Sequence, residues 1–231
     1  MPIKVAAAPE SALKLLRAGI ENYLSSGLAD PKLIDAKVVD RKLGQITGYA
    51  ALHRVFYLSL DGLVGGKPIA KVAKLVGWRA ELLDSDNQTV AAADLVIKRT
   101  GLEFANVSYG PRAVNSGDAK KVAEDWSKSK ADQELAFLNI PGIYCTLFWL
   151  RGNDGTPDAF VPIPPCPKNI EPGRVYDEDE LRAALEPLAR KQLAFVPAAA
   201  KRRSRRPAVK RSSRRRRPKR AKTRRQSRRR R

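Results

Sequence analysis

Residues 143–150 read IYCTLFWL, and this stretch decides the fold class that we predict for the chain. Both alternating sets of its side chains are mostly apolar, so we expect a strand that is covered on both faces. It ends the apolar stretch 134–150, which leads through the polar residues 151–157 to a shorter apolar stretch at 158–164. Asp154-Gly155 suits a hairpin turn, because glycine adopts positive φ without a steric penalty. We therefore predict a hairpin whose proline-rich returning strand lies at a sheet edge or ends early.

A second hairpin is predicted upstream, from strands at 78–84 and 89–99 that are joined by the polar turn 85–88. Residues 102–109 have the composition of a further strand. Strands joined by short turns pair antiparallel. The sequence therefore predicts a mostly antiparallel sheet centred on residues 78–164.

The residues before this sheet are less decisive. The apolar stretch 49–60 suits a buried strand as well as a buried helix, because periodicity does not separate the two. Residues 61–68, DGLVGGKP, have the composition of a loop. Residues 69–78 predict a short helix that ends at Gly77.

Three stretches predict helices that pack against the sheet: 10–26, 116–130 and 177–193. Each has apolar residues at steps of three and four, which is the period of an amphipathic helix. Ser116 is the expected N-cap of the second helix, because a hydroxyl there accepts a bond from a free backbone amide.

The last helix has the clearest signals at its start. Asp177 is the expected N-cap, and Glu180 stands three residues later, as in a capping box. Pro187 lies inside the apolar stripe of this helix and is expected to kink or split it, since proline lacks an amide donor.

The charge of the chain is divided very unevenly. The net charge is +21, and 20 of the 45 Lys and Arg lie in residues 201–231, which contain no Asp or Glu. The remaining 25 basic residues nearly balance all 24 acidic ones. We therefore predict a globular α+β domain at 1–196 and a disordered polybasic tail at 197–231, where no large apolar side chains are present to offset the charge repulsion.

The predicted nucleic-acid contacts are all in this tail. A guanidinium stays charged and matches phosphate oxygens through two parallel N–H bonds. The tail has no aromatic residue for base stacking, so we expect phosphate contacts with little sequence preference, on DNA or RNA. The residues concerned are Lys201, Arg202, Arg203, Arg205, Arg206, Lys210, Arg211, Arg214, Arg215, Arg216, Arg217, Lys219, Arg220, Lys222, Arg224, Arg225, Arg228, Arg229, Arg230 and Arg231.

In composition, residues 201–231 resemble the arginine-rich arms of protamines, of linker-histone-like bacterial proteins and of some viral capsid proteins. The resemblance covers the tail alone and implies binding or compaction of nucleic acid. We predict a cytoplasmic or nucleoid-associated location if the host is bacterial and a nuclear one if it is eukaryotic, where residues 214–222, RRRRPKRAK, would pass as a nuclear localisation signal. An anionic membrane is the rival partner of such a polycation, through charge alone.

The body has no specific catalytic motif. The glycine-rich residues 62–68 depart from a phosphate-binding loop, and Asp84 and Asp86 lack the rest of a calcium loop. His53, the only histidine, is interpreted as a packed structural residue. The chain is too long to need stapling by its two cysteines, Cys145 and Cys166, which indicates a reducing compartment, although the two can still pair. We expect no cofactor, no metal and no membrane span.

This absence favours a non-enzymatic body that serves as an interaction or oligomerisation domain, with a homo-oligomer as one outcome. Two alternatives stay open. The body can be an enzyme or ligand-binding domain that the tail holds near nucleic acid, which a polar cleft at His53 or Asp61 would favour. The whole chain can also be a structural component that packages nucleic acid in an assembly.

Overall fold

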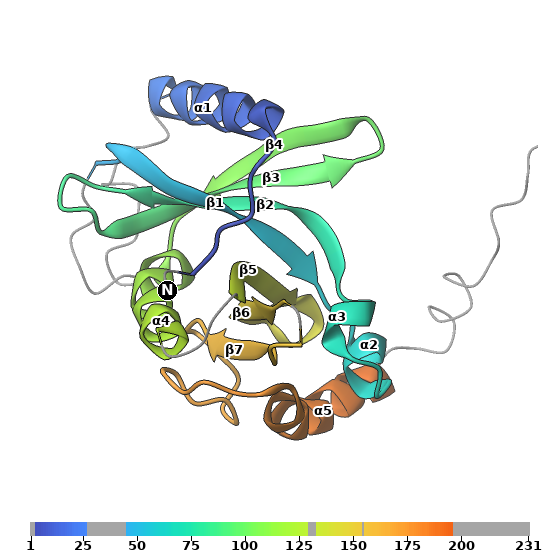
Figure 1. The fold of residues 1–231 in the computed structure, drawn as a ribbon. Helices are drawn as coiled ribbons and strands as arrows, with labels where there is room; N and C mark the ends of the chain where they lie inside the picture. Colours follow the sequence, from blue (N-terminus) through green and yellow to red (C-terminus); the bar gives the residue numbers. More distant parts are fainter. Residues whose placement is uncertain (1–2, 27–44, 129–132, 154, 196–231) are drawn as a thin grey trace, which may run out of the picture. The chain divides into compact units, whose positions relative to one another are not determined.

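The computed structural model describes residues 3–26, 45–128, 133–153 and 155–195. They form an α+β fold built on one seven-stranded sheet, with the strand order β4-β3-β2-β1-β5-β6-β7 (Figure 1). Every neighbouring pair is antiparallel except β1 and β5, which are parallel. The predicted fold class is therefore confirmed. The strands are β1 (Gly48–Tyr57), β2 (Lys74–Leu83), β3 (Thr89–Lys98), β4 (Gly101–Ser108), β5 (Gln133–Ile140), β6 (Cys145–Gly152) and β7 (Ala159–Pro162).

The helices cover both faces of the sheet. Alternation along β6 places Trp149 in the core beneath α5, whereas Phe148 and Leu150 pack in the core beneath α4. Residues of α1 pack with β2 and β3 in a third core, around Trp78 and Leu95 (Figure 1). The helices are α1 (Glu10–Ser25), α2 (Leu60–Val64), α3 (Ile69–Val72), α4 (Pro111–Ser127) and α5 (Glu178–Phe195).

The stretch 134–150 forms two strands rather than one. β5 and β6 pair antiparallel along their whole length and are joined by a single 3₁₀ turn, η2 (Pro141–Ile143). The predicted burial of the second strand on both faces is confirmed, because all residues from Cys145 to Leu150 are buried. β7 pairs back onto β6 as the last strand of the sheet, in agreement with the edge position that its prolines predict. Asp154 of the predicted turn lies outside the described residues, and Gly155 has φ +86°.

The parallel junction between β1 and β5 opens like a fork. The two strands pair only from Val55 to Tyr57 on β1 and from Phe137 to Asn139 on β5. On the N-terminal side of this pairing the two strands separate, and β5 pairs with the N-terminal segment of the chain instead. Lys4 N donates to Gln133 O at 3.0 Å, and Leu135 N donates to Lys4 O at 3.0 Å. A space bounded by β1, β5 and the N-terminal segment results.

Several local predictions are confirmed. The hairpin of β2 and β3 forms around residues 85–88, and β4 adds to its free side. The capping box of α5 is present, with Glu180 N donating to Asp177 Oδ1 at 2.8 Å and Asp177 N donating to Glu180 Oε2 at 3.3 Å. The helix predicted at 10–26 is α1.

Other predictions are wrong in their details. Residues 61–68 are not a plain loop, because Ser59 Oγ accepts from Gly62 N at 3.1 Å and caps the short helix α2. The helix predicted over 69–78 is only the single turn α3, and Gly77 lies within β2. A Cβ at Gly77 would stand 1.9 Å from the carbonyl oxygen of Leu95. Glycine is therefore needed there by the close approach of β3 rather than by a helix end.

The second and third predicted helices also differ from expectation. α4 begins at Pro111, because proline is favoured at the first helical position, where its missing amide is not needed. Ser116 is thus not a cap but a buried residue in the first half of the helix. Pro187 does not split α5, which runs continuously from Glu178 to Phe195.

Candidate functional site

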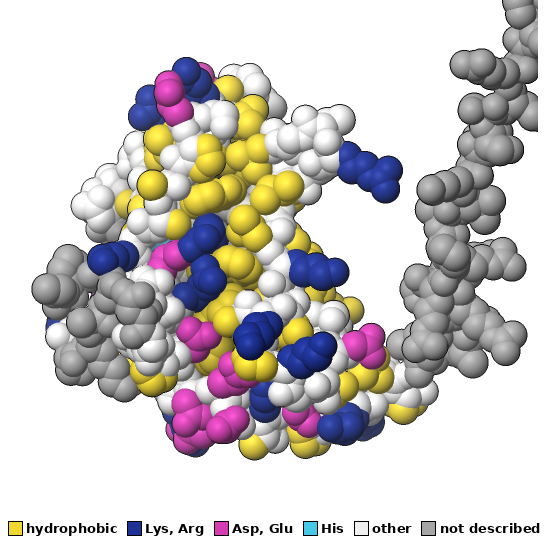
Figure 2. All heavy atoms as spheres, turned by 45° about the vertical axis from the view of Figure 1, so that its right-hand side comes forward, with side chains coloured by type: hydrophobic (Ala, Val, Ile, Leu, Met, Phe, Trp, Pro, Cys, Tyr) yellow, Lys and Arg dark blue, Asp and Glu magenta, His cyan; other side chains and the backbone are white. Residues whose placement is uncertain are grey.

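All basic residues that we predict to contact nucleic acid, from Lys201 to Arg231, lie outside the described residues. The described body is different in character. On the face in Figure 2, Lys and Arg side chains alternate with Asp and Glu around a band of exposed apolar groups. This mixture agrees with the near balance of charge in residues 1–200. Within the described residues of the body, chemically distinctive side chains gather at three places.

The first place is the fork between β1 and β5. His53 is 0 % exposed, and its Nδ1 lies 3.3 Å from the main-chain carbonyl of Leu135. A carbonyl only accepts, so Nδ1 carries the proton of the neutral ring and Nε2 keeps its lone pair. Burial lowers the pKa of His53, which keeps the ring neutral near neutral pH. The rings of Phe137 and Phe148 meet it edge-on, so the structural interpretation of His53 has a direct basis.

His53 nevertheless has one unsatisfied atom. Its Nε2 is buried and has no hydrogen-bond partner among the described residues. The ring lies at the wall of a pocket, here called the fork pocket, that also involves Lys120 and Glu124 of α4. The fork pocket is lined by Ile3, Val5, Ala51, His53, Lys120, Glu124, Ser127, Lys128 and Leu135. The only histidine thus adjoins a pocket whose lining is mostly apolar, with Lys120, Glu124 and Lys128 as its charged members.

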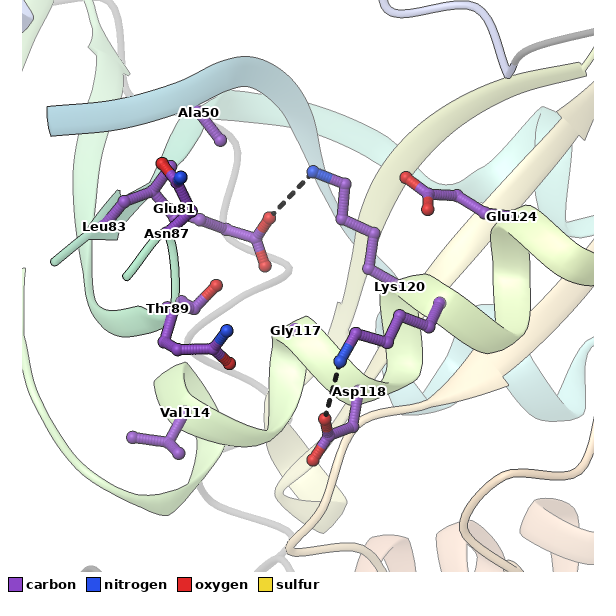
Figure 3. Close-up of a pocket in the computed structure, with 12 residues that line it drawn as sticks. Ala50, Glu81, Leu83, Asn87, Thr89, Val114, Gly117, Asp118, Lys120 and Glu124 are labelled. Carbon is purple, nitrogen blue, oxygen red and sulfur yellow. Dashed lines mark hydrogen bonds and ion pairs between the residues drawn. The ribbon is translucent and has the colours of Figure 1, made fainter. Parts of the chain in front are cut away.

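The second place lies on the other side of Lys120. Glu81, on β2, is only 1 % exposed, and its Oε2 accepts from Lys120 Nζ at 3.2 Å (Figure 3). Its Oε1 lies 2.6 Å from Ser116 Oγ, whose hydroxyl is also 2.6 Å from the Ala113 carbonyl. Burying a carboxylate requires such partners. Glu81 lines a second pocket between β2, β3 and α4, and Figure 3 shows Glu124 one turn beyond Lys120 in its wall. Lys120 and Glu124 line both this second pocket and the fork pocket.

The remaining buried charges of the sheet are paired with one another. Arg79 donates to both carboxylate oxygens of Asp94, at 2.7 and 2.9 Å. Arg54 donates to both oxygens of Glu134, and Arg151 lies 3.7 Å from the same carboxylate. Because these carboxylates already have cationic partners, they are poor candidates for a general base.

The third place lies at the β5–β6 turn and the C-terminal half of α5. Tyr144 follows η2, is 80 % exposed and has the left-handed φ of 52°. Arg112 Nη2 donates to the Tyr144 carbonyl at 2.9 Å, and Lys168 and Lys191 line the same pocket. We call Arg112, Tyr144, Lys168 and Lys191 the Tyr144 surface. The prediction that Tyr144 belongs to a strand covered on both faces is wrong, because β6 begins at Cys145 and Tyr144 is exposed. The Pro141-Gly142 pair was the available signal of a turn at this point.

The remaining sequence candidates have structural explanations. Asp84 Oδ1 accepts from the backbone amides of Asp86 and Gln88, at 3.0 and 2.9 Å, so it closes the β2–β3 turn. Cys145 and Cys166 are both free thiols. Burial raises the pKa of Cys145 to about 12, which leaves almost no reactive thiolate. Within the described ranges, no group of three or more His, Cys, Asp or Glu side chains gathers in a way that could hold a metal ion.

The fold is thus an α+β body with a buried histidine, a buried carboxylate–lysine pair and an exposed tyrosine among cations. Comparison with protein-family models, with curated proteins and with solved structures returned no match. Among the helices that the structure describes, none is both long and apolar enough to cross a membrane.

Proposed function

We propose that this protein binds nucleic acid, with phosphate contacts from residues 201–231 and little preference for base sequence. One observation carries the proposal: 20 of these residues are Lys or Arg, and none is Asp or Glu. The body contributes a domain for a partner or for self-association. If it self-associates, several tails act together and avidity increases without any new contact.

The magnitudes favour this partner. Duplex DNA carries one charge per ~1.7 Å of its axis, so 20 tail charges match roughly 34 Å of duplex. If eight contacts form, the logarithm of the binding constant falls with the logarithm of salt concentration at a slope of about −7. A basic tail that served only as an address for transport would not require such contacts.

The test measures this salt slope for the full chain and for two matched variants. In the first variant, Arg214, Arg215, Arg216 and Arg217 are replaced by Gln. In the second, the exposed body residues Lys14, Lys71, Lys121 and Arg190 are replaced by Gln. We expect the tail variant to lose about 3 to 4 units of slope on duplex DNA, and the body variant to match the parent. Equal slopes for all three proteins, or no binding by the parent, would contradict the proposal.

A second candidate function rests on the unpartnered Nε2 of His53. With its lone pair free, this atom accepts a hydrogen bond from a ligand hydroxyl, while Lys120 in the same wall, beside its bond to Glu81, has further N–H donors for a carboxylate. This supports the ligand-binding alternative, with a small hydroxycarboxylate as the chemistry to probe. Glycolate and acetate differ only in the hydroxyl. A nitrogen-15 shift at His53 Nε2 with glycolate but not acetate is the expected result, and no shift with either removes this candidate.

A further inference from the structure

Tyr144 is held in an unusual way for an aromatic residue. Its φ of 52° is left-handed, a conformation that glycine and asparagine adopt at little cost and that a bulky side chain adopts at a cost. Its side chain gains no burial in return, since 80 % of the residue is exposed. Local strain combined with exposure of a large ring is the pattern found at binding sites.

The residues around this ring are cationic and apolar. Arg112, Lys168 and Lys191 supply three positive charges, and none of the described residues that line the pocket is acidic. Ile143, Pro165 and Leu188 supply apolar walls. Arg112 is anchored by its bond to the Tyr144 carbonyl, while its Nε is buried without a partner. The Tyr144 surface therefore combines an exposed ring, fixed positive charge and an unsatisfied donor.

We infer that the Tyr144 surface binds single-stranded nucleic acid, with an unpaired base stacked on the Tyr144 ring and phosphates on the surrounding cations. The inference rests on the proposed function and adds to it a preference that the tail lacks. An aromatic platform accepts any base, because every base has a π-face. Bases within a duplex are already stacked and paired, so the ring offers them nothing. The tail, which has no aromatic residue, makes no such distinction.

The position of the surface along the chain agrees with this role. Pro187, Leu188 and Lys191 belong to the last turns of α5, and the first tail lysine, Lys201, follows Phe195 by six residues. Six residues span at most about 22 Å when fully extended. Because the two sets of cations belong to one chain, binding of a strand by either raises its effective concentration for the other.

The experiment uses the full chain and three probes of about 16 nucleotides: oligothymidine, the same strand with abasic sites, and a duplex. Tyr144→Asn removes the ring with a residue that tolerates left-handed φ, so the fold is retained. Tyr144→Phe keeps the ring. We expect Tyr144→Asn to weaken oligothymidine binding about 5- to 150-fold, with duplex and abasic binding unchanged. Tyr144→Phe binds all three probes like the parent.

The outcomes separate this inference from the proposed function. If the parent binds no probe, the proposed function fails. If the parent binds with a steep salt slope and Tyr144→Asn matches it on all three probes, only the present inference fails. Polyglutamate is added as a control ligand. If Tyr144→Asn loses as much affinity for polyglutamate as for oligothymidine, the inference is also overturned, since the surface would then bind an acidic protein. Thermal unfolding of each variant confirms that binding is compared between folded proteins.

Discussion

The imidazole Nδ1 of His53 lies 3.3 Å from the carbonyl oxygen of Leu135, at the place where the β1–β5 ladder ends. Leu135 lies two residues before Phe137, which is the first residue of β5 to pair with β1. A side chain thus joins the two strands where their main chains separate, and it does so from a fully buried position. The ring is neutral in this role, because burial disfavours the charged imidazolium and lowers the pKa of His53.

The buried His53 predicts a specific pH dependence of stability. Burial lowers its pKa below the ordinary value, with Lys120 acting in the same direction and Glu81 and Glu134 opposing. Below about pH 6.5 the unfolded chain takes up a proton that the folded chain does not, so the free energy of unfolding decreases as pH falls toward the folded pKa. The slope is at most ~1.4 kcal/mol per pH unit.

Denaturant unfolding between about pH 5 and pH 8 measures this dependence. His53 is the only histidine, so the signal has a single source among histidines. His53→Gln should lose the dependence between about pH 5.5 and 6.5, whatever its stability at neutral pH. A variant with the same dependence as the parent would show that His53 is not the group responsible.

Substitutions at Glu81 and Lys120 should have strongly coupled effects on the free energy of unfolding. Lys120→Met leaves a fully buried carboxylate with Ser116 as its remaining side-chain partner, which should lower the free energy of unfolding by roughly 1–3 kcal/mol. Adding Glu81→Gln removes the uncompensated charge and should recover part of that loss. Urea unfolding of the parent, the two single variants and the double variant gives a double-mutant cycle. Additive changes in the free energy of unfolding would contradict the coupling.

Gly77 predicts a steric effect in the middle of the sheet. Gly77→Ala places a methyl group against the Leu95 carbonyl, 1.9 Å away before any relaxation, and should destabilise the fold by about 3 kcal/mol or more. Gly48→Ala is the matched control in β1, because no atom lies within 4 Å of a Cβ there. Thermal unfolding should separate the two variants clearly. Similar midpoints would mean that β2 and β3 do not approach so closely.

Replacing Arg182 should lower the stability of the fold far more than replacing Arg190, which lies on the same helix. It is buried in α5, donates to the carbonyls of Leu63 and Lys67, and bonds Glu178 Oε1 at 2.9 Å. Arg182→Met removes the side-chain donor of the Leu63 and Lys67 carbonyls, while Glu178 Oε1 keeps its bond from Ile69 N, and should cost about 3 kcal/mol of stability. Arg190→Met removes only an exposed pair with Glu186 and should change stability by less than about 0.5 kcal/mol. Equal unfolding midpoints for the two variants would show that the buried bonds of Arg182 do not stabilise the fold.

Predictions from sequence succeeded where the signal is short-range. Asp177 and Glu180 bond across one helical turn, and Asp84 bonds amides two and four residues away. Such contacts depend on neighbours in the chain, so residue type and spacing identify them. The hairpins were predicted correctly for the same reason, because a turn and its two strands lie within one continuous stretch of sequence.

The errors came from residues whose surroundings are distant in sequence. The sequence around Gly77 predicts a helix end, but glycine is needed there because the Leu95 carbonyl of β3 leaves no room for a Cβ. The sequence around Tyr144 predicts a strand, but this residue follows the turn η2 and is exposed to solvent. Glu81 gave no signal at all, because its partners Ser116 and Lys120 lie on α4, more than thirty residues along the chain.

The sequence by itself determined the α+β class, the hairpins and the concentration of positive charge in residues 201–231, since composition and local spacing suffice for these. Only the tertiary structure decided the fork at Leu135, the burial of Glu81 and the exposure of Tyr144. Each of these depends on pairing between segments far apart in the chain. Such pairing is set by packing of the whole core, and no single stretch of sequence contains it.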